Sequence, residues 1–140
     1  MASPEVLLVT TPEPSSLTDS YSLLKVLYRN PGFSDADTKI HIVANRVNSR
    51  EEGQALYEKV NSVVSQFLHG SLNFLGMIPQ DLALEKAVRQ QKTVALSYPN
   101  AKSSHAIENL AENLLNGTQE EIRERWGIVQ MFSSFLSNRK

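Results

Sequence analysis

The sequence predicts an α/β fold of three layers around a mostly parallel sheet, and two observations lead to this prediction. Three apolar runs, at residues 6–9, 40–43 and 72–78, have the aliphatic, partly β-branched composition of strands in a covered sheet. Each run is followed by a polar or proline-containing loop and then by a helical pattern. Strand, loop and helix repeated in this order give parallel strands joined by right-handed crossovers.

The first unit starts close to the N-terminus. We expect a strand at 6–9 and a stiff loop at 10–14, because two prolines in that loop exclude both a strand and a helix interior. Ser15 or Ser16 is the expected N-cap of the following helix, and Asn30-Pro31-Gly32 is its expected end. The apolar stripe of this helix consists of Leu17, Tyr21, Leu24 and Tyr28, widened by Leu23 and Leu27.

The second unit contains the stretch K-I-H-I-V-A-N-R-V-N at 39–48, whose strand is expected to stop at Asn45-Arg46. Ser49 and Glu52 have the spacing of a capping box, which predicts a helix over about 50–68. Gly70 is the expected stop of this helix. Its expected buried face comprises Leu56, Val60, Val63, Val64, Phe67 and Leu68.

The third unit has a strand at 72–78 that ends in Pro79-Gln80-Asp81, with Asp81 as the N-cap of a short helix. After it, residues 93–96 are expected to form a short strand or an extended connection. Ser103 or Ser104 then caps a further helix, which Asn116-Gly117 is expected to stop.

A ligand site is expected where the three strands end. In an open α/β sheet, ligands bind in the crevice outside the carboxyl ends of the strands. The loops with Pro12 and Glu13, Asn45 and Arg46, and Pro79 to Asp81 should converge there, as such loops do in every fold of this kind. The Asn45 carboxamide offers a donor and an acceptor that match the N6/N7 edge of adenine. The plain alternative is a polar turn that closes a strand.

The C-terminal part is expected to be a separate element, which divides the chain into an α/β domain at 1–117 and an amphipathic helix at 118–140. Basic residues at its ends and Trp126 at the start of its apolar part suit a membrane surface. The alternative is a helix that docks on its own domain or on a partner. The apolar face consists of Ile128, Val129, Met131, Phe132, Phe135 and Leu136.

Composition narrows the function further. The chain has 140 residues, 41% hydrophobic and 21% charged, which fits an ordinary globular domain. A net charge of −1 gives no case for nucleic-acid binding. Cysteine is absent and the three histidines are widely separated, so we expect no metal site.

Three stretches of the sequence resemble the MinD/ParA family of ATPases, in particular its FlhG branch (also called FleN or YlxH). They are V-L-L-V-T-T-P-E-P-S-S-L-T-D-S-Y at 6–21, I-V-A-N-R-V at 42–47 and L-G-M-I-P-Q-D at 75–81. The resemblance covers nearly all of the chain and corresponds to the C-terminal half of such a protein.

This resemblance implies a cytoplasmic P-loop ATPase that dimerises around ATP and binds the inner face of the cell membrane through a terminal amphipathic helix. It also implies a role in flagellar placement and number, with flagellar assembly proteins as partners. By resemblance, Asn45, Arg46, Pro79 and Asp81 bind the nucleotide base, and Pro12 and Glu13 lie in a loop at the nucleotide and dimer interface.

The chain departs from the family because the phosphate-binding machinery lies upstream of residue 1. No G-x-x-x-x-G-K-[ST] motif occurs, so ATP binding is expected to be weak or absent and Mg²⁺ is not expected. This chain alone is therefore expected to be inactive as an ATPase and to have no catalytic residues. A non-enzymatic interaction or membrane-tethering module on the same fold is the alternative. The missing half would also leave a sheet edge exposed.

Overall fold

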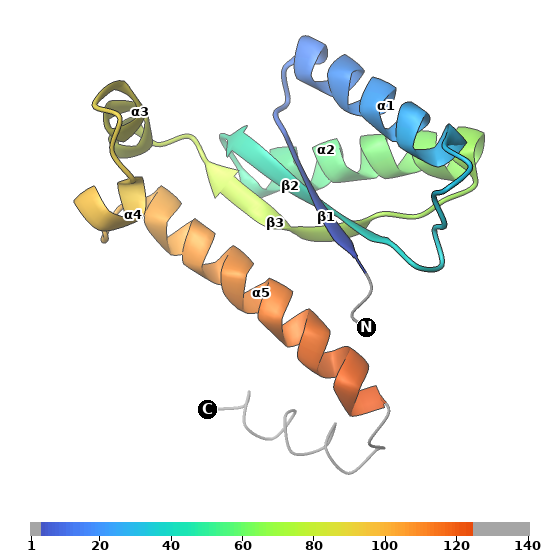
Figure 1. The fold of residues 1–140 in the computed structure, drawn as a ribbon. Coiled ribbons are helices and arrows are strands. Elements are labelled where there is room, and N and C mark those ends of the chain that lie inside the picture. Colours follow the sequence, from blue (N-terminus) through green and yellow to red (C-terminus); the bar gives the residue numbers. More distant parts are fainter. Residues whose placement is uncertain (1–3, 125–140) are drawn as a thin grey trace. The chain divides into compact units, whose positions relative to one another are not determined.

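The computed structural model describes residues 4–124, and it contains a parallel sheet of three strands in the order β1-β2-β3 (Figure 1). The predicted α/β class and parallel strands are confirmed. The chain divides between Leu110 and Ala111 into two units. The strands are β1 (Glu5–Thr10), β2 (Lys39–Val47) and β3 (Asn73–Pro79).

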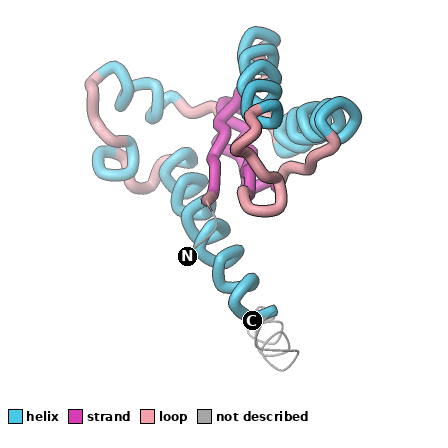
Figure 2. Tube along the Cα trace, turned by 45° about the vertical axis from the view of Figure 1, so that its right-hand side comes forward, coloured by secondary structure: helices cyan, strands magenta, loops and turns pink. Residues whose placement is uncertain are grey.

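Two helices, α1 (Pro14–Arg29) and α2 (Arg50–Val63), pack together on one face of this sheet (Figure 2). Alternate residues of β2 point toward them, since successive strand side chains face opposite sides. The resulting core contains Ile40, Ile42, Ala44 and Val47 of β2, Leu17 and Leu24 of α1, and Leu56 and Val60 of α2. On the opposite face of β1, Leu7 and Val9 are 50% and 53% exposed.

The start of α1 differs from the expected N-cap. Pro14 occupies the first turn, where its missing N–H costs nothing, so the helix begins before the two serines. Ser16 therefore lies inside the first turn. Its hydroxyl accepts a hydrogen bond of 2.9 Å from the Thr11 N–H and lies 3.1 Å from the Thr10 hydroxyl oxygen.

The start of α2 agrees with the predicted capping box. The Ser49 hydroxyl accepts a 3.1 Å hydrogen bond from the Glu52 N–H, and the Glu52 carboxylate accepts one of 3.4 Å from the Asn48 N–H. Serine at this position satisfies a donor that the helix cannot satisfy internally.

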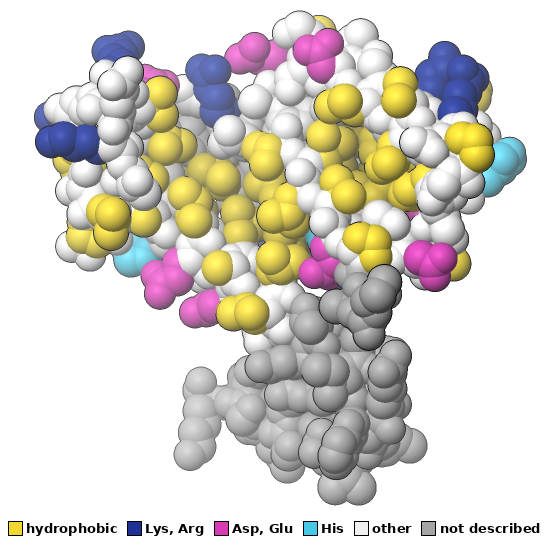
Figure 3. All heavy atoms as spheres, in the orientation of Figure 1, with side chains coloured by type: hydrophobic (Ala, Val, Ile, Leu, Met, Phe, Trp, Pro, Cys, Tyr) yellow, Lys and Arg dark blue, Asp and Glu magenta, His cyan; other side chains and the backbone are white. Residues whose placement is uncertain are grey.

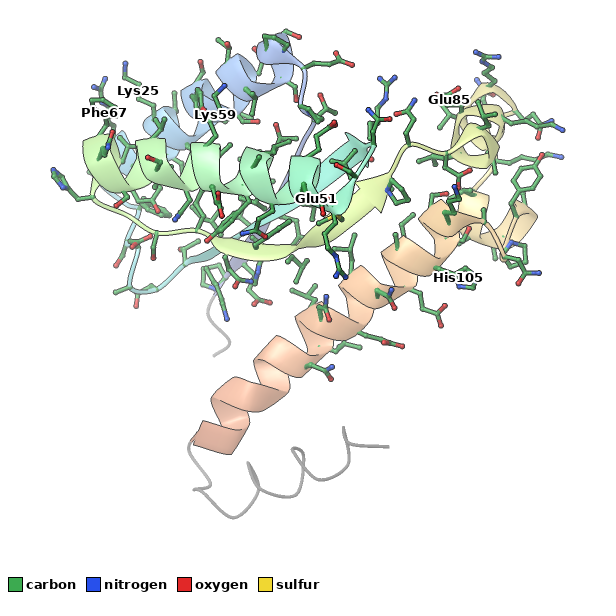
Figure 4. The ribbon with its side chains drawn as sticks, turned by 180° about the vertical axis from the view of Figure 1, so that it is seen from behind. Lys25, Glu51, Lys59, Phe67, Glu85 and His105 are labelled. Carbon is green, nitrogen blue, oxygen red and sulfur yellow. The ribbon has the colours of Figure 1, made fainter. Side chains whose placement is uncertain are left out.

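The same helical segment ends at Leu68, as predicted, but its last turn and the residue that stops it differ from the prediction. After Val63 the chain forms a π-helical turn, η1 (Val64–Leu68), and the left-handed residue that ends it is His69, with a φ of 55°, rather than Gly70. A π turn contains more residues than an α turn, so it rotates the following side chains. Phe67, expected in the core, is consequently 73% exposed and lies on the outside of the helix layer (Figure 4).

Two predictions for the later part of the chain are wrong. Residues 93–96 fall in a short helix, α4 (Val94–Ser97), instead of a strand or an extended connection. Helix α5 (Lys102–Glu124) runs through Asn116-Gly117 without stopping, since one glycine costs a helix only about 1 kcal/mol. The predicted cap of α3 (Leu82–Arg89) is confirmed, because Asp81 accepts a hydrogen bond from the Ala83 N–H.

The predicted apolar face at 128–136 lies outside the described residues. Among the described helices, none combines the length and the apolar character that a membrane crossing requires.

Candidate functional site

The three loops that follow the strands line two neighbouring hollows at the carboxyl ends of the sheet. The first hollow, of about 510 Å³, is lined by Asn45, Arg46, Pro79, Gln80, Asp81, Leu84, Glu85, Val88 and Arg89. The second, of about 390 Å³, is lined by Thr11, Pro12, Glu13, Arg46, Asn48, Glu52 and Gln80. All six residues predicted for this end of the sheet thus line one hollow or the other, and Arg46 and Gln80 line both.

Arg46 separates the two hollows from an unusual backbone position. It is the extra residue of a bulge, because Asn45 pairs with Ile78 and Val47 pairs with Pro79. Its φ of 57° is left-handed, which costs a non-glycine residue roughly 1–2 kcal/mol. The guanidinium Nε donates to Gln80 Oε1 at 3.3 Å, and Nη1 lies 3.4 Å from Glu13 Oε1. The loops after all three strands therefore meet at this side chain.

Asn45 is held in a defined orientation at the first hollow. Its side-chain oxygen accepts a 2.9 Å hydrogen bond from the Arg46 N–H, and the residue is half-buried. A carboxamide has two N–H donors, and its oxygen has a second lone pair. The hydrogen bond from the Arg46 N–H thus orients the Asn45 side chain and still leaves it a donor and an acceptor for a ligand.

Asp81 connects the loop after β3 to two helices. One carboxylate oxygen accepts from the Ala83 N–H at 3.0 Å, at the start of α3, and the other accepts from the Ser103 N–H at 2.9 Å, at the start of α5. The Ser103 N–H is the main reason that the pKa of Asp81 is lowered from its ordinary value. The Asp81 carboxylate therefore holds the starts of α3 and α5 together beside the first hollow.

Several lining residues were not predicted as base-binding residues, although one of them, Gln80, belongs to the loop at 79–81 that was predicted to reach the site. Gln80 lies at the centre, since its side chain accepts from Arg46 and donates to Glu85 Oε1 at 2.8 Å; Glu85 is labelled on α3 in Figure 4. Leu84 and Val88, four residues apart on α3, supply an apolar wall, and Arg89 supplies a second cation. The i, i+4 spacing of Leu84 and Val88 signalled one helical face, but not that this face would line a hollow.

The first hollow combines an apolar wall, an oriented carboxamide and two guanidinium groups. This combination suits a flat, polar-edged ring, which can lie against aliphatic side chains while its edge bonds to the amide. Within residues 4–124, no group of three or more acidic or histidine side chains has the arrangement of a metal site.

Comparison of the sequence and the fold with known proteins identifies relatives of this chain. No protein-family model matches the sequence. The chain is 38% identical over 113 residues to the antiactivator FleN of Pseudomonas aeruginosa, which covers 81% of this chain and 39% of FleN. It is 32% identical over 138 residues to the flagellum site-determining protein YlxH of Helicobacter pylori, which covers 96% of this chain and 45% of YlxH.

The fold agrees with these relatives. The cell division ATPase MinD of Pyrococcus furiosus matches with a TM-score of 0.55 and 25% identity, over 80% of this chain and 42% of that one. This chain is a partial, FlhG-like member of the MinD/ParA family. A MinD from Pyrococcus horikoshii, described as complexed with Mg-ADP, shows the same fold with a TM-score of 0.54. The FlhG-like chain thus spans less than half the length of each of these proteins.

Proposed function

We propose that this chain supplies the adenine side, and a membrane- or partner-binding element, of an FlhG-like ATPase that controls flagellar placement and number. The observation that carries the proposal is the first hollow, where Asn45, Arg46, Pro79 and Asp81 come together at the ends of parallel strands. The family supports it, since one solved MinD is described as a complex with Mg-ADP.

The residues of the hollow fit a nucleotide base. Adenine would place its N6 and a ring nitrogen against the carboxamide of Asn45, with one face against Leu84 and Val88. They do not fit a triphosphate, because phosphate sites use a series of backbone N–H groups from a glycine-rich loop, and this sequence has no such loop. ATP in a complete protein would supply the transferable phosphoryl group, and this chain would bind and orient only the base.

Titration of the chain with adenosine and with ATP, followed by NMR shifts of backbone amides, tests this proposal. Both ligands should bind about equally weakly, since the phosphates find no partner, and should shift amides around 45–46 and 79–81. Asn45→Ala should weaken adenosine binding on the order of tenfold or more, because a good bidentate contact contributes about 1–3 kcal/mol.

Asn48→Ala is the matched control, because Asn48 is exposed and lines only the second hollow. It should bind adenosine like the unaltered chain. Equal adenosine binding by Asn45→Ala and the unaltered chain would contradict the proposed base contact. A strong preference for ATP that EDTA abolishes would instead reveal a phosphate site elsewhere.

The second candidate function is that of a non-enzymatic membrane-tethering or interaction module, and the apolar positions at 128–136 favour it. Liposome co-sedimentation on anionic vesicles, with Phe132→Glu against Ser133→Glu, tests it. If the face binds lipid, Phe132→Glu should abolish sedimentation and Ser133→Glu should not, because only the first places a charge on the apolar face. Equal sedimentation of both variants would reject lipid binding by this face.

The proposal also implies a cellular location and partners for the protein. An FlhG-like ATPase of this kind would act in the cytoplasm and at the inner face of the cell membrane, as a homodimer and with flagellar assembly proteins. The names of the FleN and YlxH relatives, an antiactivator and a flagellum site-determining protein, support this assignment.

A further inference from the structure

Gln80 connects two sides of the first hollow through the two ends of one amide. Its Oε1 accepts a hydrogen bond of 3.3 Å from the Nε of Arg46, at the end of β2, and its Nε2 donates one of 2.8 Å to Glu85 Oε1, on α3. The residue is half-buried and lines both hollows. A single side chain thus joins the strand end that carries one wall of the first hollow to the helix that carries the other.

Each of the two residues that Gln80 contacts stands next to a residue placed to touch a base. Arg46 follows Asn45, and its backbone N–H donates to the Asn45 side-chain oxygen at 2.9 Å. Glu85 follows Leu84 on α3, whose apolar side chains form the opposite wall. The distance between the Asn45 carboxamide and this wall determines whether a flat ring fits between them. The hydrogen bonds of Gln80 span that distance.

The neighbours of position 80 favour an amide there. A guanidinium only donates hydrogen bonds and a carboxylate only accepts them, so a residue between Arg46 and Glu85 needs one acceptor and one donor. Charge alone would favour a carboxylate, because Lys and Arg side chains gather at the α3 end of the face shown in Figure 3. Helix α3 carries Lys86 and Arg89 in its last turn. A glutamine at this position is therefore explained by the paired hydrogen bonds rather than by charge.

Other contacts fix the main chain around Gln80. Its N–H donates to Val47 O at 2.9 Å, and the neighbouring Asp81 caps the start of α3. These contacts hold the first residues of the helix, whereas the bond to Glu85 fixes the side of α3 that lines the hollow. Loss of the side-chain bonds should therefore displace one wall of the hollow without unfolding the domain.

We propose that Gln80 is a positioning residue of the base site, whose amide holds the apolar wall of α3 at the distance from Asn45 that a nucleobase requires. It acts through Arg46 and Glu85 rather than by touching the base. The inference rests on the proposed adenine-binding function, and it adds a residue on which that function depends.

The test exchanges the donor and the acceptor of one hydrogen bond. Gln80→Glu keeps an acceptor for Arg46 but sets two carboxylates against each other, so the bond to α3 is lost. Glu85→Gln in the same chain supplies the missing donor. The double variant Gln80→Glu/Glu85→Gln therefore regains the bond with its polarity reversed, which a role in size alone would not require.

NMR of the full chain gives two readouts. Without ligand, the methyl signals of Leu84 and Val88 should shift in Gln80→Glu and return in the double variant. Gln80→Glu should also raise the Kd for adenosine roughly three- to tenfold, the range that loss of one ordinary hydrogen bond gives, and the double variant should restore it. Gln80→Met, which keeps the length but loses the amide, should behave like Gln80→Glu, and adding Glu85→Gln should not restore it.

Gln54→Glu is the matched control. Gln54 Nε2 donates to Glu58 Oε1 at 3.2 Å in an exposed pair on α2, and neither residue lines a hollow described above. The variant makes the same change of charge beside a glutamate and should alter neither readout.

Three results would overturn the proposal: unshifted methyl signals in Gln80→Glu, adenosine binding by Gln80→Glu as tight as that of the unaltered chain, or no recovery in the double variant. Failure of the unaltered chain to bind adenosine would contradict the proposed function instead. The methyl signals of the ligand-free variants would then decide whether Gln80 positions the wall of the hollow.

Discussion

Arg46 has a left-handed backbone conformation that glycine would adopt at less cost. An arginine at this position therefore implies that its side chain has a role. The contact with Glu13 is exposed, and exposed ion pairs contribute about 0–1 kcal/mol. Stability alone therefore gives a weak reason for arginine here. Its position on both hollows gives a stronger one.

Substitution of Arg46 should separate these two roles. Arg46→Gly should change the free energy of unfolding by less than about 1 kcal/mol, because relief of the left-handed conformation offsets the lost contacts and the added chain entropy. Arg46→Val should destabilise by about 1–2 kcal/mol, because a β-branched residue tolerates this φ poorly. Urea unfolding measures both, and a large loss in Arg46→Gly would show that the side chain is structural.

Asp81 should make stability depend on pH. The folded-state pKa of its carboxyl is below the ordinary value of 3.8, so the ionised form stabilises the fold above that value. This contribution is lost as the pH falls through the folded-state pKa. Asp81→Asn keeps an oxygen that can accept from the Ala83 N–H but loses the charged acceptor of the Ser103 N–H. It should therefore destabilise at pH 7 by about 1–3 kcal/mol, and by less at pH 2–3.

The measurement for Asp81 is urea unfolding at both pH values. Asp19→Asn, at an exposed position of α1, serves as the control and should show no such difference. An Asp81→Asn effect that is equally large at pH 2–3 would mean that the carboxylate charge does not contribute.

The position of the site could be predicted from the sequence, but its full lining could not. Asn45, Pro79 and Pro12 follow predicted strands, and parallel strands bring their carboxyl ends to one edge, so their convergence needs only the strand assignment. Leu84 and Arg89 line the same hollow through the placement of α3, which Asp81 fixes by its hydrogen bond to Ser103, 22 positions away in the sequence. Sequence periodicity does not report such a contact.

At the scale of single elements, α2 depends on a short local signal at its start. Ser49→Ala should lower the free energy of unfolding by about 1 kcal/mol, because the Glu52 N–H loses its acceptor. Ser62→Ala, at an exposed position of the same helix, should change it by less than about 0.5 kcal/mol. Thermal unfolding of both variants checks this, and equal melting temperatures would show that the cap contributes nothing.

Two side-chain caps were predicted correctly, whereas two glycines were wrongly expected to stop helices. The caps at Ser49 and Asp81 follow from spacing alone, and the structure has both. Gly70 and Gly117 were expected to stop helices because glycine often does so, yet neither ends one. His69 took the left-handed position instead, one residue earlier than expected. A glycine permits a stop, but packing around it decides whether one occurs.

For the whole molecule, hydrolysis of ATP is the decisive functional measurement. Phosphoryl transfer depends on a loop that holds the phosphates and on Mg²⁺ ligands, and this sequence has no P-loop motif. Steady-state phosphate release by the purified chain should therefore equal that of a control without protein. Release above both this control and a mock purification would show that the chain has a phosphate site of another kind.

The π-helical turn between α2 and β3 predicts where related sequences can differ in length by one residue. Such a turn contains one more residue than the regular helix around it, so it is what a single-residue insertion would leave behind. Alignments of this segment should then tolerate a one-residue gap at 64–68 without displacing β3. Deletion of the exposed Phe67 should restore regular winding, and the shortened protein should remain folded.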